Sequence, residues 1–447
     1  MSSQDMTLPE AMVKTLDHFA PEFWQALARV KDPRHPLMLA YPIEMELLVA
    51  LLMFITKLGS RRNIKYKLGT PAFAANLQNL CTLLYPKTWR PFPDSVPHGD
   101  TLNYLLKGVA PREIHVLRRL IIRSLIRKRA LEGFRLLGRC YPVAVDGTGQ
   151  LVFNEKHCER CVHKTHDGQT VYYHPVVEAK LALENGLALS VGTAFMENVA
   201  PAAKKAATKQ DCELKGFYRL AKELKADFPL LDICLLLDGL FANGPVIRLC
   251  KRNRWAYIIT FKEGSLPAVW QEYQALKTLA PKDVLVVNEQ DCRRTYRWVN
   301  DIDLDGQSVN AFECLEETPQ GTTPFVWLTG FTVTAANVVE LAAGGRRRWK
   351  IENEGFNTQK NGGYELEHAY STDATAMKNF YLLLQIGHLI SQLMEKGSML
   401  RKRIRDTMGS LRAFSQRLWA SLTETSIDLE RLRRILETRI QIRFDTS

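Results

Sequence analysis

The sequence predicts a mixed α/β protein in which an all-helical N-terminal part precedes a core that contains a β-sheet. Three observations support this fold class. Residues 1–139 carry apolar residues at helical spacing. Short apolar runs typical of strands begin at Tyr141 and surround one helical segment, up to residue 262. Further strand-like runs fill most of residues 263–332 before the pattern becomes helical again.

The composition is that of a folded, basic protein. The chain has 447 residues, enough for two or three domains, and 46% of them are hydrophobic, which favours packed cores over disorder. The formal net charge of +12 favours an acidic polymer as partner, nucleic acid first. A basic protein with no such partner is the alternative.

The cysteines and the hydropathy pattern bear on the compartment. Nine cysteines are scattered along the chain without a signal peptide, which predicts reduced thiols in the cytoplasm. The most apolar window, residues 43–58, is interrupted by Glu44 and Glu46 and ends near Lys57. It is too short and too charged to span a bilayer, so we expect a buried helix there and no membrane partner.

Residues 111–137 are predicted to form one long helix with a basic face. Its apolar positions include Ile114, Leu117 and Ile121. Its cations are Arg118, Arg119, Arg123, Arg127, Lys128 and Arg129. A helical module with such clusters suits the recognition of DNA. An ordinary solvated basic face is the competing interpretation.

Two aspartates stand where apolar strands are expected to end. Residues 141–145 read as a short strand followed by Asp146 and a glycine-rich turn, and residues 230–237 read as a longer strand followed by Asp238. A carboxylate at the end of a buried strand is costly unless a metal or a cation satisfies it. Each signal alone is weak, because strand, aspartate and glycine are also ordinary turn chemistry.

A third acidic position lies on a predicted helix that begins near Arg346 and stops at Gly362-Gly363. Trp349, Ile351 and Phe356 are expected to pack inward. Arg348 and Glu352 are four residues apart and share one helical face, as do Lys350 and Glu354. A carboxylate flanked by cations suits a phosphodiester-cutting site, and a solvated face of ion pairs is the alternative.

The three positions together resemble a known family. The phrases AVDGTG, LLLDGLFANGPV and IENEGFNTQKNGGYELEH look like those of the DDE transposases of bacterial insertion sequences, which have a ribonuclease-H-like core. The similarity runs from about Tyr141 to His388, and RWKIE resembles part of the family's Tyr-Arg-Glu-Lys signature. The signature tyrosine position falls on Gly345, and the lysine position falls on Gln359, next to Lys360.

The resemblance implies a site and its partners. Asp146, Asp238 and Glu352 would bind Mg²⁺ or Mn²⁺ through oxygen ligands. Glu352 is preferred over Glu354 because Arg348 sets the register. The residues expected to contact phosphate are Arg348, Lys360, Lys262 and Arg347. The implied partner is double-stranded DNA, both element ends and target, with a homo-oligomer as the active complex.

The same resemblance divides the chain. Residues 1–139 would be the helical DNA-binding domain, and residues 140–262 the first part of the ribonuclease-H-like core. Residues 263–332 would be a β-rich insertion, residues 333–400 the second part of the core, and residues 401–447 a basic helical tail that contacts DNA or a second protomer.

The loop after Asp146 has the spacing of a metal site. Cys158 and Cys161 are three residues apart, and His163 and His166 follow closely, as expected for a tetrahedral structural zinc. Two alternatives remain open, a polar loop with incidental cysteines and a DNA-facing loop that uses the histidines.

Three functions are compatible with this sequence. The first is a transposase that cuts and joins DNA at the ends of an insertion sequence. The second is a transposase-derived DNA-binding protein with a silenced site, and the third is a metal-dependent nuclease without strand transfer. The fold cannot separate them, because the same core serves all three.

Overall fold

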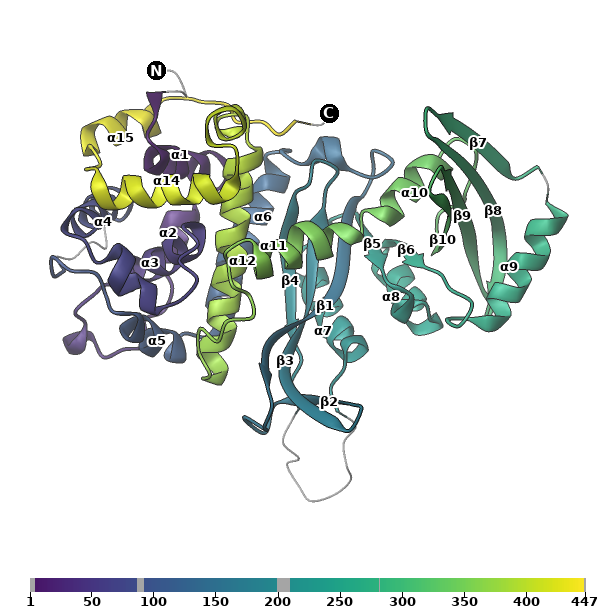
Figure 1. The fold of residues 1–447 in the computed structure, drawn as a ribbon, viewed down its shortest axis with the longest axis horizontal. Helices are drawn as coiled ribbons and strands as arrows, with labels where there is room; N and C mark the ends of the chain where they lie inside the picture. The colour runs from purple at the N-terminus through teal and green to yellow at the C-terminus, as the bar shows by residue number, and fades with distance from the viewer. Residues whose placement is uncertain (1–4, 87–91, 199–209, 281, 446–447) are drawn as a thin grey trace.

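The computed structural model describes residues 5–86, 92–198, 210–280 and 282–445. It is a mixed α/β protein with N-terminal helices and one 10-stranded sheet, as the sequence predicts at this level. A helical body, a central sheet and a β-rich end follow one another along the longest axis (Figure 1). Within the described ranges, no helix is long and apolar enough to cross a membrane.

The helical body combines both ends of the chain. Its N-terminal helices are α1 (Leu8–Phe19), α2 (Phe23–Ala28), α3 (Ile43–Ile55), α4 (Pro71–Leu84), α5 (Gly99–Gly108) and α6 (Pro111–Arg127). Its C-terminal helices are α12 (Ala374–Lys396), α13 (Arg401–Arg403), α14 (Leu411–Glu424) and α15 (Leu429–Glu437). Every residue of α3 is buried, as expected for its apolar sequence.

The C-terminal helices pack on the N-terminal ones. Helix α12 contacts α3, α5 and α6, and both α14 and α15 contact α1 and α4. The predicted basic tail is therefore part of the helical body and not a free arm. Helix α6 ends at Arg127, ten residues before the predicted end at residue 137.

The sheet joins an antiparallel and a parallel half. Its first strands are β1 (Tyr141–Phe153), β2 (Val162–His166), β3 (Gln169–Ala182), β4 (Ala188–Phe195), β5 (Ile233–Leu237) and β6 (Ala256–Thr260). Strand β3 pairs antiparallel with β1, β2 and β4, whereas β1, β5 and β6 are parallel neighbours. Helices α7 (Glu213–Asp227) and α8 (Gly244–Asn253) connect these strands.

The predicted β-rich stretch extends the same sheet. It contains α9 (Pro267–Leu279), β7 (Val284–Glu289), β8 (Cys292–Leu304), β9 (Gln307–Thr318) and β10 (Gly321–Thr329). Strand β10 pairs antiparallel with β6, and β9, β8 and β7 follow outward in that order. The strands predicted in this stretch are confirmed, and β6 is their attachment point.

Helices cover both faces of β3 and β4. Side chains alternate between faces along a strand. Val177 faces Gly216 of α7, whereas the next residue, Glu178, contacts Tyr381 of α12. Helices α6 and α12 therefore lie on the face opposite α7, between the helical body and the sheet.

Two local predictions near the expected site are wrong. Strand β1 does not end at Asp146 but continues to Phe153, because β3 is long enough to pair with it on both sides of the aspartate. The predicted helix from Arg346 begins earlier, as α10 (Val338–Arg346), turns, and resumes as the π-helix η6 (Ile351–Asn357) and α11 (Thr358–Asn361). Ile351 and Phe356 are buried as predicted, but Trp349 is exposed.

Candidate functional site

The two predicted aspartates lie on neighbouring parallel strands. The register of β1 and β5 pairs Ala144 with Leu236, and two more residues along each strand lead to Asp146 and Asp238. Asp238 directly follows β5 and precedes the short helix η5 (Gly239–Phe241), so this predicted strand end is confirmed. Parallel pairing thus brings two carboxylates from distant sequence to the same level of the sheet.

Arg348 joins Asp146 to the predicted glutamate. One guanidinium nitrogen, Nη1, lies 2.7 Å from Oε1 of Glu352 and 3.3 Å from Oδ2 of Asp146. The arginine side chain is 10% exposed, that of Asp146 23% and that of Glu352 43%. The group is open to solvent on the glutamate side and closed on the arginine side.

The environment of Asp146 opposes its charge. Burial raises the pKa of this carboxyl to about 7, even though the Gly147 amide and Arg348 pull it down. The neighbouring Glu352 raises the pKa further, by like charge. Without a metal, Asp146 is therefore ready to take up a proton near neutral pH.

A fourth carboxylate, Glu213, lies near Asp238 and against the backbone at Gly147. A Cβ atom on Gly147 would overlap the Glu213 carboxylate, so the glutamate lies against the backbone next to Asp146. Burial raises the pKa of Glu213, and the negative charge of Asp238 raises it further. Its only signal in the sequence is an acidic residue at the start of α7, which is common in helices.

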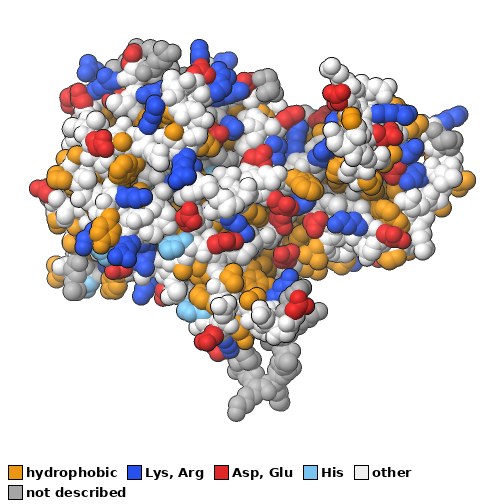
Figure 2. All heavy atoms as spheres, in the orientation of Figure 1, with side chains coloured by type: hydrophobic (Ala, Val, Ile, Leu, Met, Phe, Trp, Pro, Cys, Tyr) orange, Lys and Arg blue, Asp and Glu red, His pale blue; other side chains and the backbone are white. Residues whose placement is uncertain are grey.

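Acidic side chains gather near the middle of one face, over β1 and β5 (Figure 2). The three predicted acidic ligands do not form a closed metal site in this structure. Among the described residues, Asp146, Asp238 and Glu352 do not form a group whose ligand atoms all lie within 4.8 Å of one another. Arg348 occupies the space between Asp146 and Glu352 instead.

Glu354, the rejected alternative to Glu352, points elsewhere. It accepts a hydrogen bond from Lys350 at 3.1 Å and lines a cavity with Tyr364, His388 and Lys396. The register set by Arg348 thus places Glu352, and not Glu354, beside Asp146.

Of the four expected phosphate contacts, two are engaged elsewhere in this structure. Arg347 is buried and pairs with Glu184 at 2.9 Å, and Lys360 pairs with Glu367 at 2.7 Å. Arg348 binds the carboxylates described above, and Lys262 is exposed just after β6.

The local packing explains both residues, Gly345 and Gln359, that differ from the Tyr-Arg-Glu-Lys signature. A side chain at Gly345 would collide with the indole of Trp327. Gln359 is fully buried and donates hydrogen bonds to Gln385 and His388, so a lysine there would be an unpaired buried charge.

The cysteine loop forms a three-ligand group with a residue that the sequence analysis missed. The Sγ atoms of Cys158 and Cys161 are 3.7 Å apart, and Nε2 of His174 lies 3.5 Å from the first and 3.4 Å from the second. These three residues could hold a metal ion. His174 comes from β3, thirteen residues beyond Cys161. The twelve residues between them match the usual Cys-x2-Cys-x12-His spacing of zinc sites, which is the signal that could have found it.

His163, one of the two predicted histidine ligands, is not in this group. His163 is exposed in β2 and its ring lies against Tyr172. The backbone of His166 pairs with Gln169, and its side chain lies outside what the structure describes. The prediction therefore fails for His163, whose ring packs on Tyr172 and not on the thiols.

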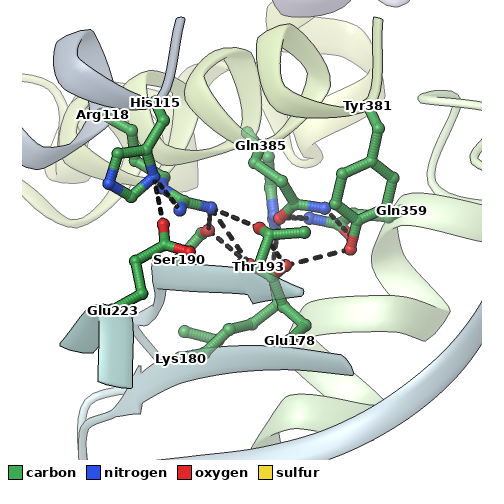
Figure 3. A network of polar contacts seen from close by, with 12 residues as sticks. His115, Arg118, Glu178, Lys180, Ser190, Thr193, Glu223, Gln359, Tyr381 and Gln385 are labelled. Atoms are coloured by element: carbon green, nitrogen blue, oxygen red, sulfur yellow. Dashed lines mark hydrogen bonds and ion pairs between the residues drawn. The ribbon is translucent and has the colours of Figure 1, made fainter. Parts of the chain in front are cut away.

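Three arginines of the basic helix α6 bind other parts of the protein. Arg118 is fully buried, forms an ion pair with Glu178 at 3.7 Å and donates to Ser190 and Thr193 (Figure 3). Arg119 and Arg123 bind Asp227 of α7. These three arginines hold α6 to the core, and the fully buried Arg118 has no surface left for a DNA contact.

A second group, His115, Glu223 and Asp227, could also hold a metal ion. Burial lowers the pKa of His115, but its hydrogen bonds to Asp227 and Glu223 outweigh burial and raise it overall. Arg119 also pairs with Asp227. We therefore interpret this group as an ion-pair network whose charges balance.

The comparisons with known proteins add no family assignment. Neither the protein-family models nor the curated proteins compared with this chain give a match.

Proposed function

We propose that this protein is a DDE-type transposase, which cuts and joins DNA strands at the ends of an insertion sequence with the help of divalent metal. One observation carries the proposal. Asp146 and Glu352, about two hundred residues apart in sequence, share the Arg348 guanidinium, and Asp238 follows the parallel strand that pairs with the strand of Asp146.

The order of elements supports a ribonuclease-H-like core. A strand (β1), a hairpin (β3 and β4), a helix (α7) and a second strand (β5) follow one another, and β1 and β5 carry the aspartates. Parallel pairing of those two strands explains why the two aspartates lie at the same level of the sheet.

The donor set fits a hard divalent cation. Asp146, Asp238 and Glu352 offer carboxylate oxygens, the ligands that Mg²⁺ prefers. When bound there, the metal would activate a water or a 3′-hydroxyl and stabilise the leaving oxygen.

Arg348 acts as the counter-charge of the acidic residues. Its guanidinium offsets two carboxylates that would otherwise repel each other across the partly buried space. With the acids neutralised by cations, the same guanidinium is free to hold a DNA phosphate.

A second candidate is a transposase-derived DNA-binding protein without catalysis. The observation in its favour is that Arg348 already satisfies Asp146 and Glu352, while Gln359 at the signature lysine position is buried. In such a protein the ion pair would be a permanent replacement for the metal.

The deciding experiment incubates the purified full chain with labelled duplex DNA from both flanks of its gene and with Mg²⁺. The transposase predicts cleavage at defined positions and joined products, both lost without Mg²⁺ and in Asp238→Asn. Cleavage without joining would identify a nuclease. Salt-sensitive binding without cleavage would identify the silenced protein, and no binding at all would refute every DNA function.

A further inference from the structure

The group formed by Cys158, Cys161 and His174 has the dimensions of a tetrahedral metal site. Zinc–sulfur bonds of about 2.3 Å and zinc–nitrogen bonds of about 2.0–2.1 Å place two sulfurs about 3.8 Å apart and sulfur and nitrogen about 3.5 Å apart. The structure has 3.7 Å between the sulfurs, and 3.5 and 3.4 Å from them to Nε2 of His174.

From this geometry we infer that Cys158, Cys161 and His174 bind a structural zinc ion. Two sulfurs and one imidazole are soft and borderline ligands, which select zinc over the magnesium that suits carboxylates. The site is independent of the proposed catalysis, because no catalytic acid takes part in it.

The surroundings of the three ligands favour a closed, structural site. Cys161 and His174 are 3% and 4% exposed, whereas the flanking positions of the loop are open. Binding converts both thiols to thiolates, so two protons leave to solvent as one Zn²⁺ enters.

We assign His157, whose ring lies near that of His174 but outside the group of three ligands, as the fourth ligand. Its Nε2 lies 3.1 Å from the carbonyl oxygen of Thr372, and because a carbonyl can only accept, this nitrogen carries the hydrogen. Nδ1 of His157 is then the nitrogen with the lone pair, and such hydrogen-bonded histidines are typical zinc ligands. Its ring centroid lies 6.4 Å from that of His174, so closure requires a small shift of the ring.

A zinc ion here would join three segments. The loop between β1 and β2 supplies the cysteines, β3 supplies His174, and the bond from His157 to Thr372 reaches the segment before α12. The strand that leaves Asp146 runs directly into this loop. The site would therefore fix the projecting hairpin of β2 and β3 to the body of the protein (Figure 1).

The first test is elemental analysis of the full chain purified without chelator. About one zinc per chain is expected, with more than a tenfold loss in Cys158→Ser, Cys161→Ser and His174→Ala. His163→Ala, in the same hairpin but outside the group, is the matched control and should keep its zinc. Unchanged zinc in His157→Ala would overturn the assignment of that residue as fourth ligand.

The second test needs no variant and so does not depend on a variant's folding. Alkylation of the unmodified protein is followed by mass spectrometry of its peptides, with and without a zinc chelator. Cys158 and Cys161 should be protected until zinc is removed, whereas the exposed Cys212 should react equally in both samples. Absence of zinc, together with reaction of Cys158 as fast as Cys212, would overturn the proposal.

Discussion

Asp146 and Glu178 face each other across β1 and β3, as a direct pair in the register, yet their surroundings differ completely. Glu178 is fully buried and accepts hydrogen bonds from Ser190, Thr193 and Tyr381, with the Arg118 guanidinium nearby (Figure 3). Asp146 is partly exposed and shares one arginine with Glu352.

The difference separates a structural carboxylate from an available one. Glu178 has a donor for each oxygen and a counter-charge, so nothing remains for a ligand to satisfy. Asp146 has one amide, a shared guanidinium and a repelling neighbour, and burial raises its pKa to about 7. A divalent cation would relieve that imbalance, which is the physical reason for placing the metal at Asp146.

The largest effect is expected for the glutamate that faces Asp146. Glu352→Gln removes a metal ligand without changing shape, so Mg²⁺-dependent cleavage should fall by about a thousandfold or more, on the order of 4 kcal/mol of transition-state stabilisation. Glu354→Gln is the matched control and should stay within a few fold. Steady-state cleavage rates compare them, and a dead Glu354→Gln would transfer the role to that residue.

The next largest effect is expected for Arg118, which pairs with Glu178. Arg118→Met leaves a buried carboxylate without its counter-charge, so the free energy of unfolding should drop by about 3–5 kcal/mol. Arg127→Met, on the same helix but exposed, should lose at most about 1 kcal/mol, because exposed ion pairs contribute little. Chemical denaturation measures the free energy of unfolding of both variants. Equal losses would contradict the role of Arg118 in stabilising the buried Glu178.

A smaller loss of stability is expected when Arg348, the partner of Asp146, is replaced. In contrast to the cleavage defect, this loss should be reduced by Mg²⁺. Arg348→Gln should cost about 2 kcal/mol in chelator, because two carboxylates lose their shared cation. Mg²⁺ should restore much of this loss by binding the freed acids. Arg347→Gln, whose partner Glu184 lies outside the site, should show no such recovery. Failure of Mg²⁺ to stabilise Arg348→Gln would argue against metal at these carboxylates.

The smallest effect lies two residues beyond Glu178, at the buried Lys180. Burial lowers the pKa of this ammonium to about 8, below its value in the unfolded chain. Between the two pKa values the unfolded state binds more protons, so stability should rise with pH from about 8 to about 10.5.

Between pH 8 and pH 9 the gain attributable to Lys180 is about 1 kcal/mol. It appears as the difference between the pH profiles of the unmodified protein and Lys180→Met, each from thermal or chemical unfolding. Lys360→Met, a partly exposed lysine, serves as control. If stability changed with pH in the same way in the unmodified protein and in Lys180→Met, the lowered pKa of Lys180 would be refuted.

Local signals in the sequence were sufficient for most elements. Alternating apolar runs predicted the strands that became β3 to β10, because period two is a property of the strand itself. The spacing of Arg348 and Glu352 predicted their contact for the same reason, since residues four apart share a helical face. The pair Cys158 and Cys161 was likewise visible as a local spacing.

Partners distant in sequence were decided only by the tertiary structure. Asp146 meets Arg348 and Arg118 meets Glu178 because strand register and helix packing bring them together. The basic pattern of α6 looked the same whether its arginines faced DNA or the core. Periodicity records which residues share a face, whereas the identity of what that face contacts depends on burial and register across the whole sheet.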